Sequence, residues 1–336
     1  MKAIALENAF GIENLHVVDR PHPTPGAGQV LLKMKAWSLN YRDLLVAKGL
    51  YNPKLKLPFV LLSDGVGEVL AAADGVTRVK VGERVAGCFM QRWMTGEPTE
   101  AGAKSALGGA IEGLAAEQVV LHEDGVVGIP AHLSDAEAAT LPCAALTAWN
   151  ALVTQGHIKA GDTVLIQGTG GVSIFALQFA RLLGARVIVT SSSNTKLDRV
   201  KKLGASDGIN YKETPNWEEK VRELTGGAGV DHVVEVGGAG TFNQSLKAVR
   251  LGGRISLIGV LAGKGDVNLT PILMKSVCVQ GIFVGSREMF EAMNRAIALH
   301  ELRPVVDRVF GLKDIQAALK HMESRAHFGK VCIAIK

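Results

Sequence analysis

A short glycine-rich turn is the stretch whose residue types most directly indicate chemistry. Residues 163–167 form an apolar run typical of a buried parallel strand, and after the turn apolar residues recur at helical spacing as far as Leu183. A strand, a glycine turn and a helix start offer free backbone N–H groups and the positive end of the helix dipole to an anion. The residues predicted to bind phosphate here are Gly168, Thr169, Gly170, Gly171 and Val172.

The turn departs from the full dinucleotide fingerprint at one position. GxGxxG requires a third glycine, and this chain has Ser173 there. Its effect does not follow from the sequence, and a tight turn without a ligand is the alternative interpretation. Because the turn lies between a strand and a helix within repeated βα units, a dinucleotide site is favoured.

The end of the next strand indicates which dinucleotide is bound. Strand 186–190 is followed by Ser191 and Ser192, and no acidic residue occurs before Asp198. A carboxylate about 4 Å from a 2′-phosphate would cost about 4 kcal/mol near a protein surface. Its absence predicts NADPH as the cofactor, with a dual NAD/NADP preference as the alternative.

The elements around this turn predict an α/β protein of two domains. Residues 127–285 alternate strands with helical patterns, which indicates a Rossmann-type doubly wound parallel sheet. Residues 1–126 contain short apolar runs broken by Gly and Pro, typical of a mostly-β domain, and residues 286–336 are expected to rejoin it. The strands expected in the Rossmann domain are 163–167, 186–190, 208–211, 231–236, 253–259 and 277–284.

Composition excludes several classes of function. The 336 residues carry a net charge of +5, but basic and acidic residues are interspersed, so no nucleic-acid partner is expected. The four cysteines form no CxxC pair, which argues against a zinc ribbon or a disulfide framework. No apolar run approaches the roughly 18 residues of a membrane span, and the N-terminus has no signal-peptide pattern. A cytoplasmic protein without a membrane partner is expected.

Several motifs together resemble the medium-chain dehydrogenase/reductases, and within them the zinc-independent quinone oxidoreductase-like branch. The resemblance covers nearly the whole chain and implies a GroES-like catalytic domain at residues 1–126. The stretches that carry it are Ser38-Leu-Asn-Tyr-Arg-Asp43, Ser63-Asp-Gly-Val-Gly67, Lys80-Val-Gly-Glu-Arg-Val85, Leu141-Pro-Cys-Ala-Ala-Leu-Thr-Ala-Trp149, Gln167-Gly-Thr-Gly-Gly-Val-Ser173, Ile209-Asn-Tyr211 and His327-Phe-Gly-Lys-Val331.

The same resemblance bears on metal binding. Zinc alcohol dehydrogenases of this family have a cysteine where this chain has Asn40 and a histidine where it has Ser63, while Cys143 matches the third ligand. Asn and Ser supply neither a thiolate nor an imidazole to zinc. No metal is therefore expected, and Cys143 is interpreted as a small buried residue.

The resemblance also implies further cofactor contacts. Lys196 and Tyr211 are expected to meet the 2′-phosphate beside Ser191 and Ser192, and Lys330 is expected near the cofactor phosphates unless it is a solvated surface lysine. The residues expected along the nicotinamide side are Val236, Gly237, Gly259, Val260, Phe283 and Val284.

The implied activity is NADPH-dependent hydride transfer to quinones, enones or similar small electrophiles. Asn40 is the first candidate hydrogen-bond donor to the acceptor oxygen, and Tyr41 and Tyr51 are the other catalytic candidates; the second tyrosine of the branch is Leu45 here. Arg42 and Asp43 are either an orienting ion pair or exposed helix charges. The alternatives are an NADP-dependent alcohol dehydrogenase or aldehyde reductase, and a nucleotide-binding protein without turnover.

A homodimer is expected through the apolar stretch 277–284. It is predicted to form the last strand of the cofactor sheet, and an exposed strand edge favours pairing with its own copy across a two-fold axis. The family resemblance also implies a dimer.

Overall fold

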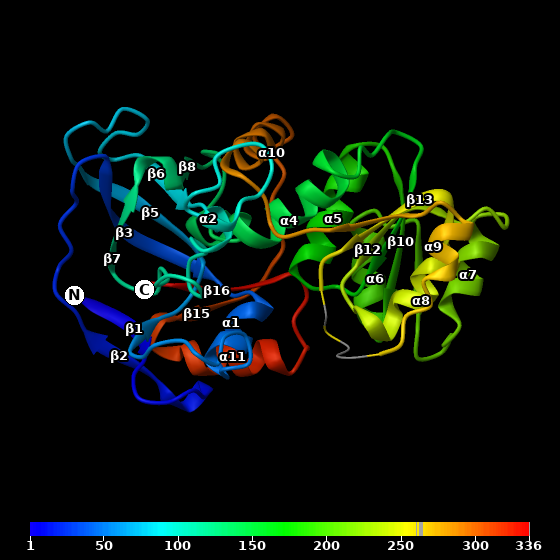
Figure 1. Cartoon of the computed structure of the whole chain (residues 1–336), viewed down its shortest axis with the longest axis horizontal. Helices are drawn as coiled ribbons and strands as arrows, with labels where there is room; N and C mark the ends of the chain where they lie inside the picture. Colours follow the sequence, from blue (N-terminus) through cyan, green and yellow to red (C-terminus); the bar gives the residue numbers. More distant parts are fainter. Residues whose placement is uncertain (260, 262–264, 336) are drawn as a thin grey trace. The chain divides into compact units, whose positions relative to one another are not determined.

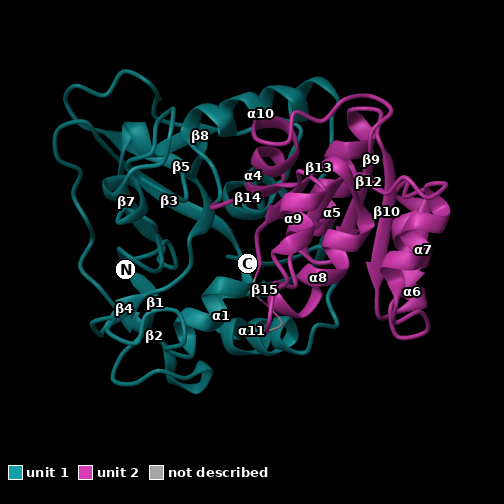
Figure 2. Ribbon diagram, turned by 45° about the vertical axis from the view of Figure 1, so that its right-hand side comes forward, with its two compact units in different colours: residues 1–146, 284–336 teal, residues 147–283 magenta. Residues whose placement is uncertain are grey.

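The computed structural model describes residues 1–259, 261 and 265–335, and these form two compact units. Unit 1 comprises residues 1–146 and 284–336, and unit 2 comprises residues 147–283 (Figure 2). The sequence analysis placed the boundary at 126/127, but residues 127–146 belong to unit 1. The reason is that β8 (Val126–Gly128) pairs with β6 (Arg84–Gly87), and α3 (Asp135–Ala138) packs on the same sheet.

Unit 1 is built on two sheets. The smaller sheet has the order β2-β1-β4, and the larger has the order β15-β16-β3-β5-β6-β8, with β7 also paired to β3 (Figure 1). The C-terminal strand β16 lies antiparallel to β3, so the end of the chain completes a sheet begun near its start. The remaining strands are β1 (Lys2–Leu6), β2 (Leu15–Asp19), β3 (Gln29–Ser38), β4 (Phe59–Val60), β5 (Asp64–Ala72), β7 (Gln118–His122), β15 (Val306–Gly311) and β16 (Lys330–Ala334).

The helices of unit 1 are short except for α10. One apolar core, which includes Trp37, Leu62 and Ile333, lies between its sheets and helices. The helices are α1 (Tyr41–Ala47), α2 (Glu100–Ala103), α10 (Arg287–Leu299), α11 (Ile315–Glu323), the π-helix η3 (Leu141–Ala145) and the 3₁₀ turns η1 (Ile12–Asn14), η2 (Glu123–Gly125) and η5 (Leu312–Asp314); α4 (Leu146–Trp149) carries the chain into unit 2.

Unit 2 is a parallel sheet of six strands in the order β11-β10-β9-β12-β13-β14. Every described pairing in it is parallel, and the central strands β9, β10 and β12 are apolar runs buried almost throughout, as expected beneath covering helices. This order is the doubly wound Rossmann arrangement that the sequence predicts. The strands are β9 (Thr163–Gln167), β10 (Arg186–Ser191), β11 (Asp207–Asn210), β12 (Val230–Glu235), β13 (Val249–Leu257) and β14 (Cys278–Gly281).

The helices of unit 2 connect these strands. Their apolar residues, among them Trp217, Phe242 and Leu246, pack with Leu165, Val233 and Ile255 of the strands in one core. The helices are η4 (Asn150–Thr154), α5 (Gly171–Leu182), α6 (Asn194–Lys202), α7 (Trp217–Leu224), α8 (Ala239–Ala248) and α9 (Thr270–Met274).

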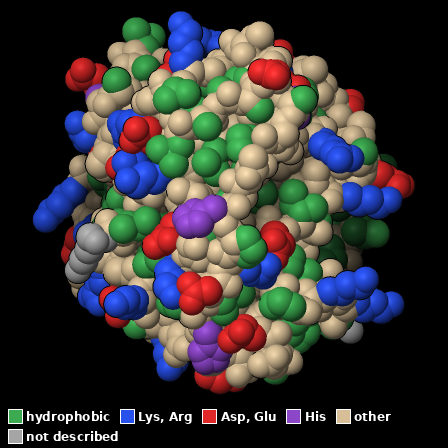
Figure 3. Space-filling model, turned by 90° about the vertical axis from the view of Figure 1, so that its left-hand side faces the viewer, with side chains coloured by type: hydrophobic (Ala, Val, Ile, Leu, Met, Phe, Trp, Pro, Cys, Tyr) green, Lys and Arg blue, Asp and Glu red, His purple; other side chains and the backbone are tan. Residues whose placement is uncertain are grey.

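The outer surface carries charges of both signs. On the face shown in Figure 3, basic and acidic side chains intermingle without a large area of one sign. The expectation of no nucleic-acid partner thus stays a prediction, and this face agrees with it. Among the described residues, no helix has both the length and the apolarity required to cross a bilayer.

Candidate functional site

The glycine turn of unit 2 has the open geometry of a phosphate site. Gly168 adopts φ +72°, a region that L side chains rarely occupy, and its N–H donates to Thr190 O at 2.8 Å. A Cβ added to Gly170 would meet no atom within 4 Å, so the space beside the start of α5 is open. The helix therefore begins with exposed backbone donors where the sequence predicts a pyrophosphate.

Ser173 takes a specific role in place of the third glycine. Its side chain is buried, and its Oγ donates to Gln167 O at 2.7 Å. This bond ties the first turn of α5 back to the end of β9. The departure from the fingerprint is thus a small polar side chain that closes the turn.

The ends of β10 and β11 bring together the residues predicted to select NADPH. Ser191 is buried, its Oγ accepts from Ser193 N–H at 3.3 Å, and its O accepts from Tyr211 N–H at 3.1 Å. Lys196 lies in the first turn of α6, where its N–H donates to Ser193 Oγ. Ser192 is half-buried and Tyr211 is exposed. β10 itself ends without an acidic residue, as the NADPH prediction requires, but the Glu213 carboxylate lies close by and accepts from Asn194 at 2.7 Å and Asn210 at 2.8 Å.

A buried polar network behind the turn after β12 was not predicted. Glu235 is fully buried, and its carboxylate accepts from Gly237 N–H at 2.8 Å, Gly238 N–H at 3.0 Å and Thr241 Oγ1 at 2.6 Å. Gln167 Nε2 donates to the other carboxylate oxygen at 2.7 Å, as does the Ser245 hydroxyl. The network fixes the Val236-Gly237 turn to the end of β9. In the sequence, the signal for this network is a single acidic residue at the end of an apolar strand.

The predicted nicotinamide-side residues are only partly brought together. A Cβ on Gly259 would lie 2.2 Å from Val236 O, so these two turns touch and only glycine fits there. Phe283 of unit 2 is exposed, while Val284 begins the second segment of unit 1. Val284 adopts φ 58°, which is strained for a β-branched residue and typical of functional positions. Val260 lies outside the described residues.

In unit 1, Asn40 lies in a buried polar cluster with Lys330, Ser63 and Asp64. Lys330 is 3% exposed, which excludes a solvated surface lysine, and its Nζ donates to Asn40 Oδ1 and Leu39 O, both at 2.6 Å. Asn40 Nδ2 faces Ser63 Oγ at 3.4 Å, and Ser63 Oγ donates to Asp64 Oδ1 at 2.8 Å. The predicted contact of Lys330 with cofactor phosphates stays a prediction, whereas its contact with Asn40 was not foreseen.

Two carboxyl groups, Asp64 within this cluster and Asp43 beside it, have raised pKa values. Burial raises the pKa of Asp43 to about 6, although Arg42 and the Asn40 N–H, at 2.7 Å from Oδ2, act in the opposite direction. Burial also raises the pKa of Asp64, opposed by Lys330 and by hydrogen bonds that include Cys143 N–H at 3.2 Å. Ionisation of these buried carboxyl groups is therefore unfavourable, and the hydrogen-bond donors around them reduce its free-energy cost.

Arg42 and the two tyrosines lie at the rim rather than in the cluster. The guanidinium stacks 4.4 Å from the Phe89 ring and 5.2 Å from the Tyr51 ring, and it donates to Leu107 O. Asp43 is fully buried, so it is not an exposed helix charge. No Arg42–Asp43 salt bridge occurs among the described residues, although the Arg42 charge opposes the rise in the Asp43 pKa. Tyr41 and Tyr51 are exposed, and neither hydroxyl has a hydrogen bond among the described residues; their catalytic roles stay predictions.

The residues at the family's zinc position do not fit a zinc ion. Asn40 Oδ1 already accepts from an ammonium group, whose positive charge repels a cation, and the Ser63 hydroxyl is committed to Asp64. Burial, followed by the nearby Asp64 carboxylate, raises the pKa of Cys143. Cys143 alone does not supply the three protein ligands of a catalytic zinc site. Among the described residues, no group of three His, Cys, Asp or Glu side chains is arranged to hold a metal.

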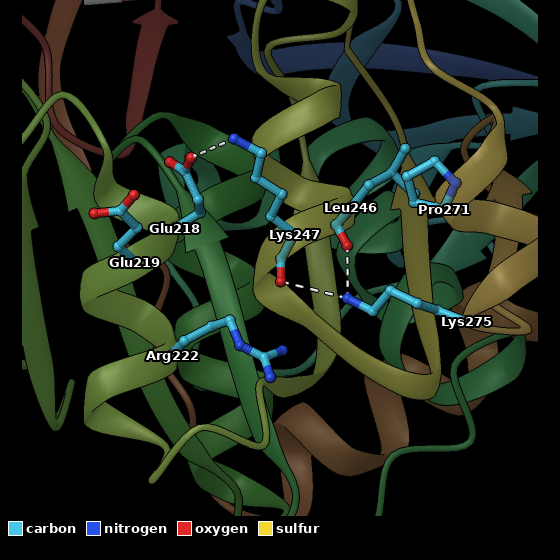
Figure 4. Close-up of a pocket in the computed structure, with 7 residues that line it drawn as sticks. All are labelled: Glu218, Glu219, Arg222, Leu246, Lys247, Pro271 and Lys275. Atoms are coloured by element: carbon cyan, nitrogen blue, oxygen red, sulfur yellow. Dashed lines mark hydrogen bonds and ion pairs between the residues drawn. The ribbon is translucent and has the colours of Figure 1, made fainter.

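A surface hollow in unit 2 is not a candidate for the nucleotide. It is lined by α7, the end of α8 and the segment around α9 (Figure 4). Lys247 pairs with Glu218 at 3.1 Å, and Lys275 Nζ donates to Leu246 O at 2.7 Å. Because α8 ends where β13 begins, the hollow lies toward the amino-terminal ends of the strands, whereas dinucleotides bind at the carboxyl ends.

Comparison with known proteins identifies the family. The model of the alcohol dehydrogenase GroES-like domain matches residues 26–131, and that of zinc-binding dehydrogenase matches residues 171–298. The zinc-type alcohol dehydrogenase-like protein C1773.06c of Schizosaccharomyces pombe is 45% identical over 92% of this chain and 91% of its own length. This chain belongs to the medium-chain dehydrogenase/reductase superfamily. It is an oxidoreductase of that superfamily, with the predicted GroES-like and Rossmann folds.

Solved structures of medium-chain dehydrogenase/reductases match over the whole length. A putative alcohol dehydrogenase from Sinorhizobium meliloti 1021 has a TM-score of 0.92 at 45% identity, covering 99% of this chain and 98% of its own. A mycobacterial protein in complex with NADPH has a TM-score of 0.83 at 30% identity, covering 99% of both chains. A quinone oxidoreductase from Coxiella burnetii has a TM-score of 0.81 at 29% identity, covering 100% of this chain and 99% of its own.

Proposed function

We propose that this oxidoreductase uses NADPH, without zinc, to reduce quinones, enones or other electron-poor double bonds. The observation that carries the proposal is the Lys330–Asn40 contact, at 2.6 Å, in the place where zinc relatives hold their metal. A zinc ion would polarise an alcohol or carbonyl oxygen directly. Without one, a substrate that is already electron-poor needs only a hydrogen-bond donor for the oxygen that gains charge.

The residues of each unit have distinct tasks in this reaction. Bound NADPH would supply a hydride to the acceptor, and one proton from solvent would balance the reduced product. The glycine turn and the Glu235 network of unit 2 hold and orient the dinucleotide. Asn40 of unit 1 donates from Nδ2 to the oxygen of the acceptor and stabilises its developing negative charge.

The preference for NADPH rests on the end of β10. Ser191, Ser192, Lys196 and Tyr211 gather there, and a lysine with hydroxyl groups suits a 2′-phosphate. The nearby Glu213 carboxylate is engaged with Asn194 and Asn210. The mycobacterial relative bound to NADPH supports this choice by similarity.

Replacing Asn40 by Ala tests the proposed reaction. Loss of the donor is expected to lower kcat for NADPH-dependent quinone reduction on the order of 100-fold, the usual effect of removing one oxyanion donor. The affinity for NADPH, measured by fluorescence titration, should not change, and Asn14→Ala serves as a control at a distant polar residue. Unchanged turnover in Asn40→Ala would remove Asn40 from the mechanism.

Two measurements on the wild-type protein test the class of reaction. Elemental analysis of protein purified without added metal should find no stoichiometric zinc. The second candidate function, NADP-dependent alcohol dehydrogenase or aldehyde reductase, is favoured by the names of the relatives at 45% identity. Steady oxidation of simple alcohols with NADP⁺ would support it, and tight NADPH binding with no turnover on any acceptor would indicate a non-catalytic binding protein.

We also propose a homodimer through the β14 edge. β14 is the terminal strand of the described sheet, and nearby α9 exposes Leu273 at 79% and Met274 at 71%. An open strand edge next to exposed apolar side chains favours a second copy. Light scattering should give twice the chain mass of 35.5 kDa, and Leu273→Asp with Met274→Asp should give the monomer mass. Leu299→Asp, at an equally exposed leucine of α10, is the control; a double variant that stays dimeric would contradict this surface.

A further inference from the structure

The buried cluster of unit 1 forms a chain of hydrogen bonds with one direction. An ammonium group can only donate, so Lys330 fixes Asn40 Oδ1 toward itself at 2.6 Å. Asn40 Nδ2 then faces Ser63 Oγ at 3.4 Å. The hydroxyl proton of Ser63 goes to Asp64 Oδ1 at 2.8 Å, which leaves the lone pairs of Oγ facing Asn40. The Lys330 ammonium thus donates to the Asn40 amide, the amide faces the Ser63 hydroxyl with its NH₂ group, and the hydroxyl donates to the Asp64 carboxylate.

The direction of these hydrogen bonds determines whether the oxygen or the NH₂ group of the Asn40 amide is available to a substrate. With Oδ1 held by Lys330, the NH₂ group lies on the other side of the side chain. Its contact with Ser63 is long, and the Asn40 side chain also hydrogen-bonds the Asp64 carboxylate, so an acceptor oxygen would take the place of the weak Ser63 contact. Asn40 is 8% exposed, whereas Lys330 is 3% exposed and has a second bond to Leu39 O at 2.6 Å.

We propose that Lys330 is a positioning residue that orients and polarises the Asn40 amide, so that Nδ2 presents an N–H to the acceptor oxygen. This inference rests on the proposed function, since the donor acts on the acceptor of that reaction. A hydrogen bond to the amide oxygen draws electrons away from its nitrogen and strengthens Nδ2–H as a donor, an effect that grows in a buried chain. Lys330 thus acts on turnover through Asn40, without contact with the acceptor.

Lys330→Met tests the inference because it keeps the aliphatic side chain and removes the ammonium. Turnover with the best quinone or enone is expected to fall on the order of 10- to 100-fold, less than or similar to the loss in Asn40→Ala. The affinity for NADPH should be unchanged. A loss of NADPH affinity with kcat retained would overturn the inference and would instead place Lys330 at the cofactor phosphates. Lys320→Met, at an exposed lysine of α11, is the control and should match wild type.

Asn40→Asp separates a positioning role from general damage to the fold. Asp keeps an oxygen acceptor for Lys330 but has no NH₂ group. The variant therefore retains the contact with the Lys330 ammonium and loses the N–H donor. We expect Asn40→Asp to stay folded, with a lower melting temperature because its second oxygen faces the Ser63 lone pairs and the Asp64 carboxylate, and to turn over as slowly as Asn40→Ala. Turnover near the wild-type rate in Asn40→Asp would show that no N–H from this residue is used.

A spectroscopic readout keeps the inference testable if no acceptor is reduced. The side-chain ¹⁵Nδ2 signal of Asn40, assigned as the signal missing from Asn40→Asp, reports the polarisation of the amide without any turnover. In Lys330→Met this signal should move toward the position of a free amide and its protons should exchange faster with water, whereas Lys320→Met should leave it in place. An Asn40 signal unaffected in Lys330→Met would refute the positioning role whatever the activity of the protein.

Discussion

Replacing Ser191 by Asp is expected to lower the affinity for NADPH on the order of 100-fold and to raise that for NADH. Ser191 is the last residue of β10 and is buried, so a carboxylate there is poorly screened. A carboxylate about 4 Å from a 2′-phosphate costs about 4 kcal/mol per unit charge at an effective dielectric constant of 20, and salt reduces this. The same carboxylate accepts hydrogen bonds from the 2′-hydroxyl of NADH.

Fluorescence titration of both cofactors measures this change. Ser206→Asp is a matched control because it adds the same charge at an exposed residue that precedes β11, near the amino-terminal ends of the strands. The control should bind both cofactors as wild type does. If wild-type protein already binds NADH as tightly as NADPH, or if Ser191→Asp leaves the ratio unchanged, the assignment of the 2′-phosphate to this turn is wrong.

Replacing Glu235 by Ala is expected to destabilise unit 2 by about 3–5 kcal/mol. The carboxylate accepts from two backbone N–H groups, two hydroxyls and the Gln167 amide, all in the interior of the unit. Without the carboxylate these donors are buried and unpaired. The resulting loss of stability exceeds the stabilisation that the hydrogen bonds provided. Glu235→Gln should lose less stability, because its amide oxygen still accepts from Gly237 and Gly238 while its NH₂ faces other donors.

Hydrogen exchange at increasing urea measures this loss within unit 2 alone. Peptides from β9 and β12 should exchange at lower urea in Glu235→Ala, while peptides from β3 and β5 of unit 1 should be unaffected. Glu219→Ala removes an exposed carboxylate of α7 and should change neither set. Equal protection of β12 in Glu235→Ala and wild type would show that the network contributes little to stability.

The fold was largely predictable because the central strands of unit 2, β9, β10 and β12, are buried almost throughout. Each predicted strand of unit 2 overlaps an observed one, since a continuous apolar run between helical patterns has few alternatives. The boundary was harder to place. Residues 127–146 continue the apolar and helical patterns on both sides, and the pairing of β8 with β6 and the packing of α3 on the same sheet assign them to unit 1.

The candidate site was predictable as residues but not as contacts. Asn40, Ser191 and Lys196 follow from local motifs, whereas the bond between Asn40 and Lys330 joins residues 290 apart and depends on β16 lying beside β3. The buried Glu235 network likewise joins the ends of β9 and β12 through side chains. In both cases the sequence shows a single charged residue at an end of an apolar strand. That residue alone does not identify its hydrogen-bond partner.

The return of β15 and β16 to unit 1 has a consequence for the order of folding during synthesis. The first 146 residues contain Asn40, Ser63 and Asp64, but Lys330 is translated only after all of unit 2. At about 5–20 residues per second, the nascent chain would hold these polar groups for roughly 10 s or more before their cation arrives. Unit 2, which is continuous in sequence, is free to fold on the ribosome first, and the proposed donor is assembled last.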